Sequence, residues 1–175
     1  WQELKKEQRK NIIIDDEEAV SLDYSQMGPR ILYGLCGTRP KTQDCYRIPD
    51  YDRYRNGIKK VFNAMTFADK QMTRFPKGVK QMFKEDIRFQ EVSDAIRRYH
   101  SGIAHKFFVG IGHYLQYLES QILIKVLLGL KDLGIHALPI HDAVVVGKAC
   151  VEMSRQLMEQ VFLDMTNVES WVQVE

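Results

Sequence analysis

The sequence contains little cysteine, no long apolar run and almost no net charge. Its three cysteines, Cys36, Cys45 and Cys150, lie far apart and form no CxxC pair. This pattern favours free thiols in a reducing, cytoplasmic compartment over a disulfide framework. No apolar run approaches the roughly 20 residues that cross a bilayer, and the first ten residues, WQELKKEQRK, do not have the pattern of a signal peptide. We therefore expect no membrane partner.

The balance of charge and composition limits the class of protein. The formal net charge is only +2, so any surface that binds nucleic acid must come from local clustering of basic residues. With 175 residues, of which 45% are hydrophobic, the chain can bury one sizeable core, with room for a small subdomain. We find no repeat and no low-complexity tract.

The spacing of apolar and turn residues predicts a mixed α+β chain. Two hairpins are predicted, in NIIIDDEEAVSLDYS and in GIHALPIHDAVVV, where β-branched residues flank polar turns. The first predicted strand pair ends at Asp23. A loop is expected over 38–52, and helices are predicted over 2–10, 29–36, 52–70, 76–99, 101–133 with a bend at Gly110 and Gly112, and ACVEMSRQLMEQVFLDM.

Two aspartates interrupt or end these apolar strands, where a charged side chain is unusual. Asp23 ends the strand in SLDYSQMGPRIL, and Asp142 interrupts the apolar run HALPIHDAVVV. A helix N-cap explains the first equally simply, and a tight turn explains the second. Taken together, the two carboxylates could share a pair of divalent cations for phosphoryl transfer. The DDEE run at 15–18 is interpreted as an exposed turn rather than a metal cluster.

A stripe of four residues recurs along the helix predicted over 52–70. Arg55, Lys59, Asn63 and Phe67 follow one another every four residues and so share one helical face. Arginine and lysine bind phosphate, and an aromatic ring one turn further can stack on a base. The stripe predicts a binding surface for a nucleoside triphosphate. The alternative is a solvated basic face with Phe67 turned to the core.

These segments, in this order, resemble the motifs of the family A polymerases. LDYSQMGPRIL resembles motif A, the spacing of Arg55, Lys59 and Phe67 resembles the fingers helix of motif B, and PIHDAVVV resembles motif C. LQYLESQILIKVLLGL resembles the helix that precedes motif C. The likeness extends over residues 19–147 and is greatest to the divergent, compact polymerase-like proteins of plasmids and phages, including primase-like ones.

The resemblance implies a role for each matching residue. Asp23 and Asp142 would bind two Mg²⁺ ions, for which Mn²⁺ can substitute, with the main-chain carbonyl of Tyr24 as a further ligand. Lys59 would contact the triphosphate and assist catalysis. The remaining implied contacts are to the nucleotide, from Arg55, Asn63, Phe67 and Gly28, and to primer and template DNA, from Arg30, Gln116 and His141.

The chain departs from the family at several positions. Ala143 stands where the DNA polymerases have a third carboxylate, and Phe62-Asn63 reverses their usual order. Gly28 stands where they have the glutamate that excludes a ribose 2′-OH, while Phe67 lacks the hydroxyl with which the related RNA polymerases favour ribose. These two differences predict weak discrimination between dNTPs and rNTPs; simple helix packing is the alternative explanation of Gly28.

We therefore expect an α+β polymerase palm, with a small antiparallel sheet packed on helices at 113–133 and 148–164, and a minimal helical fingers element at 52–70 within an insertion of about 52–112. The whole of 1–175 would form one palm and fingers unit of a longer protein, with a thumb or primase domain upstream. The implied function is template-directed nucleotidyl transfer. The alternatives are a non-catalytic, replication-associated DNA-binding module and a primase or RNA polymerase-like enzyme.

A histidine-aspartate phosphohydrolase is a further class that contains an HD pair. Those enzymes place the pair on a helix with additional histidine and aspartate ligands, whereas His141 and Asp142 lie between β-branched runs. The spacing of His100, His105 and His113 predicts no consistent metal geometry on one face.

Overall fold

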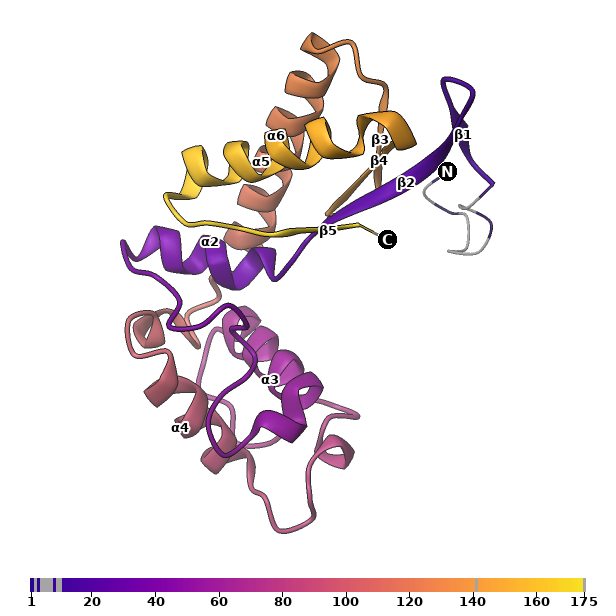
Figure 1. Ribbon diagram of the computed structural model, residues 1–175. Coiled ribbons are helices and arrows are strands. Elements are labelled where there is room, and N and C mark those ends of the chain that lie inside the picture. The colour runs from indigo at the N-terminus through magenta and orange to yellow at the C-terminus, as the bar shows by residue number, and fades with distance from the viewer. Residues whose placement is uncertain (2, 4–7, 9–10, 141, 175) are drawn as a thin grey trace. The chain divides into compact units, whose positions relative to one another are not determined.

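The computed structural model describes residues 1, 3, 8, 11–140 and 142–174 and has an α+β fold (Figure 1). The chain divides into two compact units. The first is formed by Trp1–Ile31 and Tyr117–Glu175, and the second by Leu32–Gln116. The helix predicted over 2–10 falls mostly outside the described residues.

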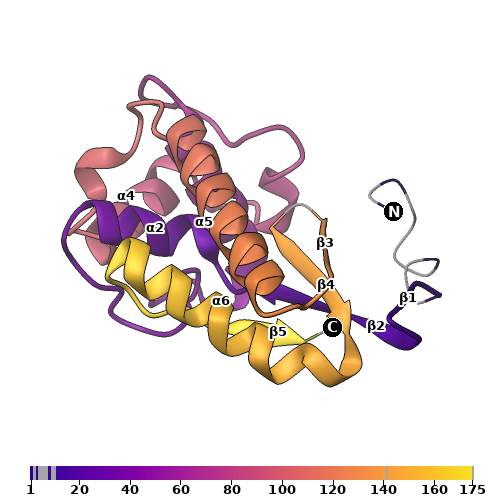
Figure 2. The ribbon, with the colours of Figure 1, turned by 90° about the horizontal axis from the view of Figure 1, so that it is seen from above.

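The first unit contains a small antiparallel sheet. Its strands are β1 (Ile13–Ile14), β2 (Glu17–Tyr24), β3 (Ala137–Ile140), β4 (Ala143–Gly147) and β5 (Val172–Val174). They are ordered β1-β2-β4-β3, and β5 pairs with the end of β2. Leu22 pairs with Val144 of β4 and also with Val174 of β5, so the end of β2 is central in the sheet. Figure 2 shows the β3–β4 hairpin in the same sheet as β2.

Both predicted hairpins are confirmed. In the first, Asp15 and Asp16 have φ angles of 52° and 63°, a left-handed pair that matches the twist of a two-residue hairpin turn. The other half of the acidic run lies in β2, where Glu17 accepts a hydrogen bond from the Ala149 N–H at 2.7 Å. The acidic run is therefore divided between the turn and the strand.

Two helices pack against this sheet. Helix α5 (Gly112–Asp132) buries Ile122, Val126 and Leu130, which recur every four residues and form one apolar stripe. Helix α6 (Val151–Thr166) buries Met158 and Phe162 in the same way, which confirms the predicted closing helix. Figures 1 and 2 show both helices on the same side of the sheet.

The second unit is helical and has an aromatic core. It contains α3 (Arg55–Phe67), α4 (Phe89–Tyr99) and the end of α2 (Met27–Leu35), which begins in the first unit. Phe62 is buried and meets His100 and Phe107 edge to face, with ring centroids 5.2 and 5.1 Å apart. The Tyr33 hydroxyl and the His100 Nδ1 are 2.6 Å apart. Burial lowers the pKa of His100 to about 4, so this ring is neutral near pH 7.

Two predicted helices are shorter than expected. The prediction over 76–99 is wrong before Phe89, because Gly78 has a φ of 74° and Arg88 forms the N-cap of α4 in a capping box with Glu91. The prediction over 101–133 is wrong before Gly112. There the chain has φ angles of 63° and 70° at Phe108 and Gly110, so Gly110 precedes the helix instead of bending it.

The end of α3 provides the reason for the second difference. The N–H groups of Phe108 and Gly110 donate to the carbonyls of Met65 and Ala68, each at 2.8 Å. These bonds use N–H donors that a continuous helix would have required for its own hydrogen bonds.

The loop predicted over 38–52 is confirmed up to Tyr51. A short 3-10 turn, Asp52–Tyr54, follows it and leads into α3. None of the described helices is long and apolar enough to cross a membrane.

Candidate active site

Asp23 and Asp142 lie at the same end of the sheet. Asp23 is half-buried in β2 and pairs with Ala143 of β4, while Gln173 of β5 flanks it on the other side. Asp142 is exposed and directly precedes Ala143, because Ile140 and Ala143 pair across the turn of the β3–β4 hairpin. From the usual spacing within and between strands, the two aspartate Cα atoms are roughly 6 Å apart.

Tyr24 has a buried side chain and a main-chain carbonyl on the β4 edge of its strand. Its ring lies 5.3 Å from that of Phe162, and its hydroxyl donates to the Met158 carbonyl at 2.6 Å. Burial raises the pKa of this hydroxyl, and Glu159 raises it further. The Ser25 N–H donates to the Trp171 carbonyl at 2.8 Å, and hydrogen-bonding direction alternates along a strand. The Tyr24 carbonyl is therefore directed to the opposite edge, towards β4.

A third acidic group, Glu119, lies in the same unit, and the sequence did not single it out. Glu119 is half-buried on α5, and a Cβ atom built on Gly28 would be 3.2 Å from its Oε1. Burial, with the like charge of Asp142 second, raises the pKa of Glu119 from 4.5 to about 7. The space beside Gly28 is therefore filled by a carboxylate, and a third acid lies near Asp142 despite Ala143.

The donors at this end of the sheet suit a hard cation. Carboxylate and carbonyl oxygens are the protein ligands that Mg²⁺ prefers, and Mg²⁺ keeps several waters rather than filling its shell with protein groups. Two aspartates and the Tyr24 carbonyl are compatible with that preference. The described residues contain no cluster of three or more histidine, cysteine, aspartate or glutamate side chains able to hold a metal ion by itself.

The predicted stripe lies on the solvent side of α3 in the second unit. Lys59, Asn63 and Phe67 are exposed, and Arg55 is partly exposed. The opposite face is buried and comprises Gly57, Ile58, Val61, Phe62, Met65 and Thr66. Phe67 is 40% exposed and does not turn into the core. Instead its ring covers Gly112, where a Cβ atom would be only 2.6 Å away, and it meets His113 edge to face at 5.4 Å.

The two basic residues of the stripe differ in how they are held. Arg55 Nε donates to Asp44 Oδ2 at 2.6 Å. Burial alone would raise the pKa of Asp44, but hydrogen bonds from Arg55 and from the Tyr46 N–H outweigh it and lower that pKa. Lys59 lies 5.9 Å above the Tyr46 ring. Within the described part of the chain, no carboxylate lies within ion-pair distance of its ammonium group. Lys59 is thus the more available cation.

Arg30, implied to contact DNA, is buried inside the first unit. It is 2% exposed, its guanidinium lies 4.1 Å above the Trp171 ring, and Nη1 donates to the Glu169 carbonyl at 3.0 Å. The structure thus corrects its direct contact with primer or template, because the guanidinium is committed to the segment that leads into β5. Arg30 instead holds the strand beside Asp23 in place.

The two other implied DNA contacts have different positions. Gln116 is exposed in the first turns of α5, in the second unit. His141 lies outside the described residues. Asp23, Tyr24, Gly28, Arg30 and Asp142 belong to the first unit, whereas Arg55, Lys59, Asn63, Phe67 and Gln116 belong to the second.

Comparison with known proteins gives a similar fold but no sequence relative. No protein-family model matches the chain, and no curated protein matches its sequence significantly. Among solved structures, it is similar to the POL domain of Pol1 from M. smegmatis in complex with DNA primer-template and dNTP, with a TM-score of 0.55 and 14% identity. The match covers 95% of this chain and 41% of that chain, so this chain has a polymerase-like fold and spans less than half of its neighbour's length.

Proposed function

We propose that this chain is the palm and a minimal fingers element of a family A-like, template-directed nucleotidyltransferase. Its partners would be primer and template DNA and nucleoside triphosphates. The observation that carries the proposal is the placement of Asp23 in a central strand, beside the turn that holds Asp142, within a polymerase-like fold. Side chains on such strands are held rigidly, as a reaction sensitive to small displacements requires.

Asp23, Asp142 and the Tyr24 carbonyl would hold two Mg²⁺ ions, or Mn²⁺ in their place. Bound there, such a pair supplies electrostatic stabilisation of the entering primer 3′-oxygen and of the leaving pyrophosphate. The contribution of the protein is positional. The ladder on both sides of Asp23 holds the main chain of one aspartate, and the pairing of Ile140 with Ala143 holds the ends of the turn that carries the other.

The stripe on α3 would bind the triphosphate. Lys59 offers a mobile ammonium that can follow charge as it develops on the leaving pyrophosphate and can donate a proton to it. Arg55 is held by Asp44 in one orientation and suits a fixed contact with phosphate oxygens. Asn63 and the exposed ring of Phe67 lie further along the same face and would contact the sugar and base.

Gly28 and Phe67 would set the choice of sugar. Gly28 has no side chain to exclude a 2′-OH, and Phe67 has no hydroxyl to bind one. The Glu119 carboxylate beside Gly28 is the group in the first unit that could replace the missing bulk. Gln116 and His141 would contact the primer and template.

Primer extension tests this function. We expect Mg²⁺-dependent addition of nucleotides to a primer annealed to a template. Asp23→Asn or Asp142→Asn should reduce it by at least about a hundredfold, because a neutral amide is a poor ligand for a hard cation. The matched control is Asp132→Asn, which removes a carboxylate from the exposed end of α5.

Two other outcomes would count against the proposal. DNA binding without any metal-dependent incorporation would favour a non-catalytic, replication-associated DNA-binding module. Incorporation that survives both aspartate substitutions would mean that the chemistry lies elsewhere in the chain. Circular dichroism of each variant separates a loss of catalysis from a loss of fold.

A further inference from the structure

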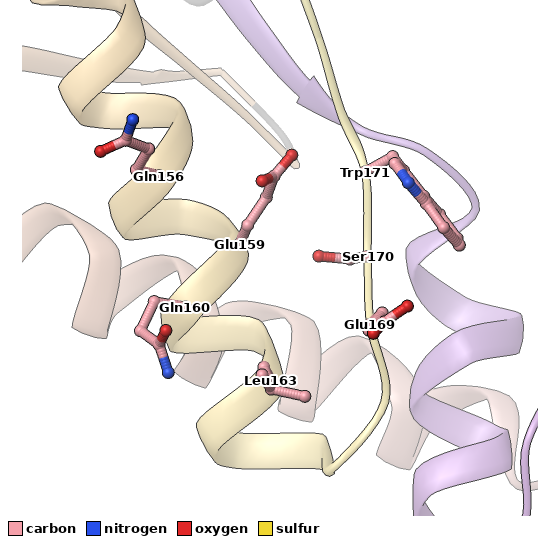
Figure 3. Close-up of a pocket in the computed structure, with 7 residues that line it drawn as sticks. All are labelled: Gln156, Glu159, Gln160, Leu163, Glu169, Ser170 and Trp171. Carbon is pink, nitrogen blue, oxygen red and sulfur yellow. The ribbon is translucent and has the colours of Figure 1, made fainter.

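Positive charge is concentrated in the second unit. Leu32–Gln116 contains 16 of the 25 lysine and arginine residues but 8 of the 23 aspartate and glutamate residues. Its formal net charge is therefore +8, whereas the rest of the chain, which forms the first unit, has a net charge of −6. In the first unit, the described residues that line a cleft beside α6 include two carboxylates, Glu159 and Glu169, and no basic side chain (Figure 3). A polyanion would thus be attracted by the second unit and repelled by the first.

A basic segment of this unit lies in the connection between α3 and α4 (Figure 1). It covers residues 70–84 and is called the basic loop. The loop contains five basic side chains and no acidic one. Its exposed residues are Lys70, Gln71, Thr73, Arg74, Lys77, Gly78, Lys80, Gln81 and Lys84. The surface of the loop is therefore entirely polar and carries positive charge alone.

The apolar residues of the basic loop fix it to the helices of the second unit. The centroid of the Phe75 ring lies 5.0 Å from that of Phe83 and 5.5 Å from that of Phe89. Val79 and Phe83 are buried, and Phe83 packs so closely on α3 that a Cβ atom built on Gly57 would be 2.6 Å from its ring. The core of the second unit thus sets the position of the backbone that carries the exposed cations.

Lys80 holds the second half of the loop together. Its ammonium group donates to the carbonyls of Lys84, Glu85 and Ile87 at 2.5–3.0 Å. It also lies 5.5 Å from the centroid of the Phe75 ring. These contacts commit the charge of Lys80 to the fold of the loop, so a partner would have to use the other four basic residues.

The other four basic side chains of the loop are available to a partner. They are those of Lys70, Arg74, Lys77 and Lys84. Within the described residues, none of these four side chains forms an ion pair or a hydrogen bond. The acids that flank the loop in the sequence, Asp69, Glu85 and Asp86, therefore do not neutralise them by direct contact. Four exposed cations on a fixed backbone can bind an anionic partner without first giving up a partner within the protein.

We propose that the basic loop binds the phosphodiester backbone of a nucleic acid, through residues that the stripe on α3 does not include. The phosphates of a nucleic acid are closely spaced and carry condensed counterions, and a cluster of cations that neutralises them gains free energy from the release of those ions. The planar guanidinium of Arg74 suits bidentate contact with phosphate oxygens. The exposed side chains of Gln71, Thr73 and Gln81 supply further hydrogen-bond donors of the kind that contact phosphates.

Two other polyanionic partners fit the basic loop less well. Binding at a membrane surface requires apolar side chains that face outward. The large apolar residues of the loop are instead buried or half-buried, with Val79 and Phe83 inside the unit. An acidic protein segment has more widely spaced charges and releases fewer counterions. A nucleic acid is therefore the partner that this surface favours.

Fluorescence anisotropy of labelled oligonucleotides, a single strand and a duplex of equal length, tests the proposal with the whole chain. EDTA is present and nucleoside triphosphates are absent, so a failed polymerase assay leaves the result interpretable. We expect saturable binding of at least one form, with an affinity that falls linearly with salt on logarithmic axes. The absence of saturation by both forms up to about 100 μM chain, in about 50 mM salt, would overturn the proposal. So would tighter binding of polyglutamate, or of phosphatidylserine vesicles, than of either oligonucleotide.

Two triple variants that remove the same charge locate the binding. The loop variant, with Arg74→Gln, Lys77→Gln and Lys84→Gln, should bind at least about tenfold more weakly in about 100 mM salt. Its salt slope should fall by roughly 2–3, because each lost phosphate contact contributes about 0.7 on a single strand and about 0.9 on a duplex. The control, with Lys125→Gln, Lys131→Gln and Lys148→Gln at exposed positions of the first unit, should change the affinity by less than about threefold.

The comparison of the two triple variants decides the location. Equal losses would mean that binding follows total charge, and unchanged affinity and slope in the loop variant would place the contact elsewhere; either result would refute the assignment to the basic loop. The charge-conserving variant with Lys77→Arg and Lys84→Arg should bind as wild type does. Circular dichroism of each variant separates a loss of binding from a loss of fold.

Discussion

Replacing Glu119 by glutamine should stabilise the first unit at alkaline pH. Glutamine has the shape of a protonated glutamate but never ionises. The folded-state pKa of Glu119 is about 7 against an ordinary value of 4.5, which corresponds to about 3 kcal/mol. Because the side chain is only half-buried, solvent screening reduces this to about 1–3 kcal/mol. We expect Glu119→Gln to raise the free energy of unfolding by that amount at pH 8.

The direction of the pH dependence follows from linkage. Above pH 7 the carboxylate is charged in both states, and the folded state carries the full desolvation penalty. As the pH falls from about 7 towards 4.5, Glu119 takes up a proton in the folded state first, so the unfolding free energy rises. The difference between wild type and Glu119→Gln should therefore disappear near pH 4.5. Asp142→Asn should reduce the difference by a smaller amount, because burial is the larger cause.

Urea unfolding followed by tryptophan fluorescence, in the presence of EDTA, provides the measurement. Trp1 and Trp171 both belong to the first unit, so the signal reports on that unit. If the two units unfold together, His100 of the second unit contributes a slope of opposite sign, because its folded pKa of about 4 lies below the ordinary value of 6.5 and stability is lost as pH falls. Comparing the variant with wild type at each pH cancels that slope. Equal stability at pH 8, or a variant less stable than wild type, would show that Glu119 is not desolvated.

Further predictions concern the nucleotide and the segment beside the sheet. Lys59→Ala should weaken nucleotide use about tenfold or more in steady-state incorporation, with little change in duplex affinity by anisotropy; equal losses would indicate a general DNA-binding face. Wild type should use dNTPs and rNTPs within about two orders of magnitude, and Phe67→Tyr should shift single-nucleotide incorporation towards rNTPs. A preference for dNTPs beyond about a thousandfold would mean that a group other than Gly28 and Phe67 excludes the ribose 2′-OH. Arg30→Lys should lower the unfolding free energy of the first unit by about 1–2 kcal/mol in the urea assay, because an ammonium stacks poorly on Trp171.

Local sequence patterns predicted the hairpins that carry the two aspartates. Alternating β-branched residues and short polar turns encode such hairpins locally, and the Asp15-Asp16 turn forms as its residues dictate. The helices predicted over 76–99 and 101–133 extended too far for a different reason. Apolar periodicity continued through Gly78 and Gly110, where the backbone takes a positive φ that periodicity does not reveal.

The remaining differences arise from long-range contacts. Strand β5 has only three residues, Val172–Val174, and it forms because the end of β2 offers it a partner. Glu119 has the sequence context of an ordinary exposed helical glutamate, and only tertiary packing brings it beside Gly28. The resemblance to motif A implied a DNA contact for Arg30, whereas Trp171 and Glu169, far along the chain, cover it.

The pairing of β2 on both edges also determines when this part of the molecule can form during synthesis. Asp23 pairs with Ala143 on one side and Gln173 on the other, so β2 leaves the ribosome long before either partner exists. At a synthesis rate of roughly 5–20 residues per second, the 150 residues between Asp23 and Gln173 correspond to about 8–30 s. Over that time β2 presents unpaired backbone edges, which other chains or a chaperone can bind. The aspartate-bearing strand is therefore synthesised before the strands that pair with it and is completed only after β5 is made, while the local helices of the second unit can fold in between.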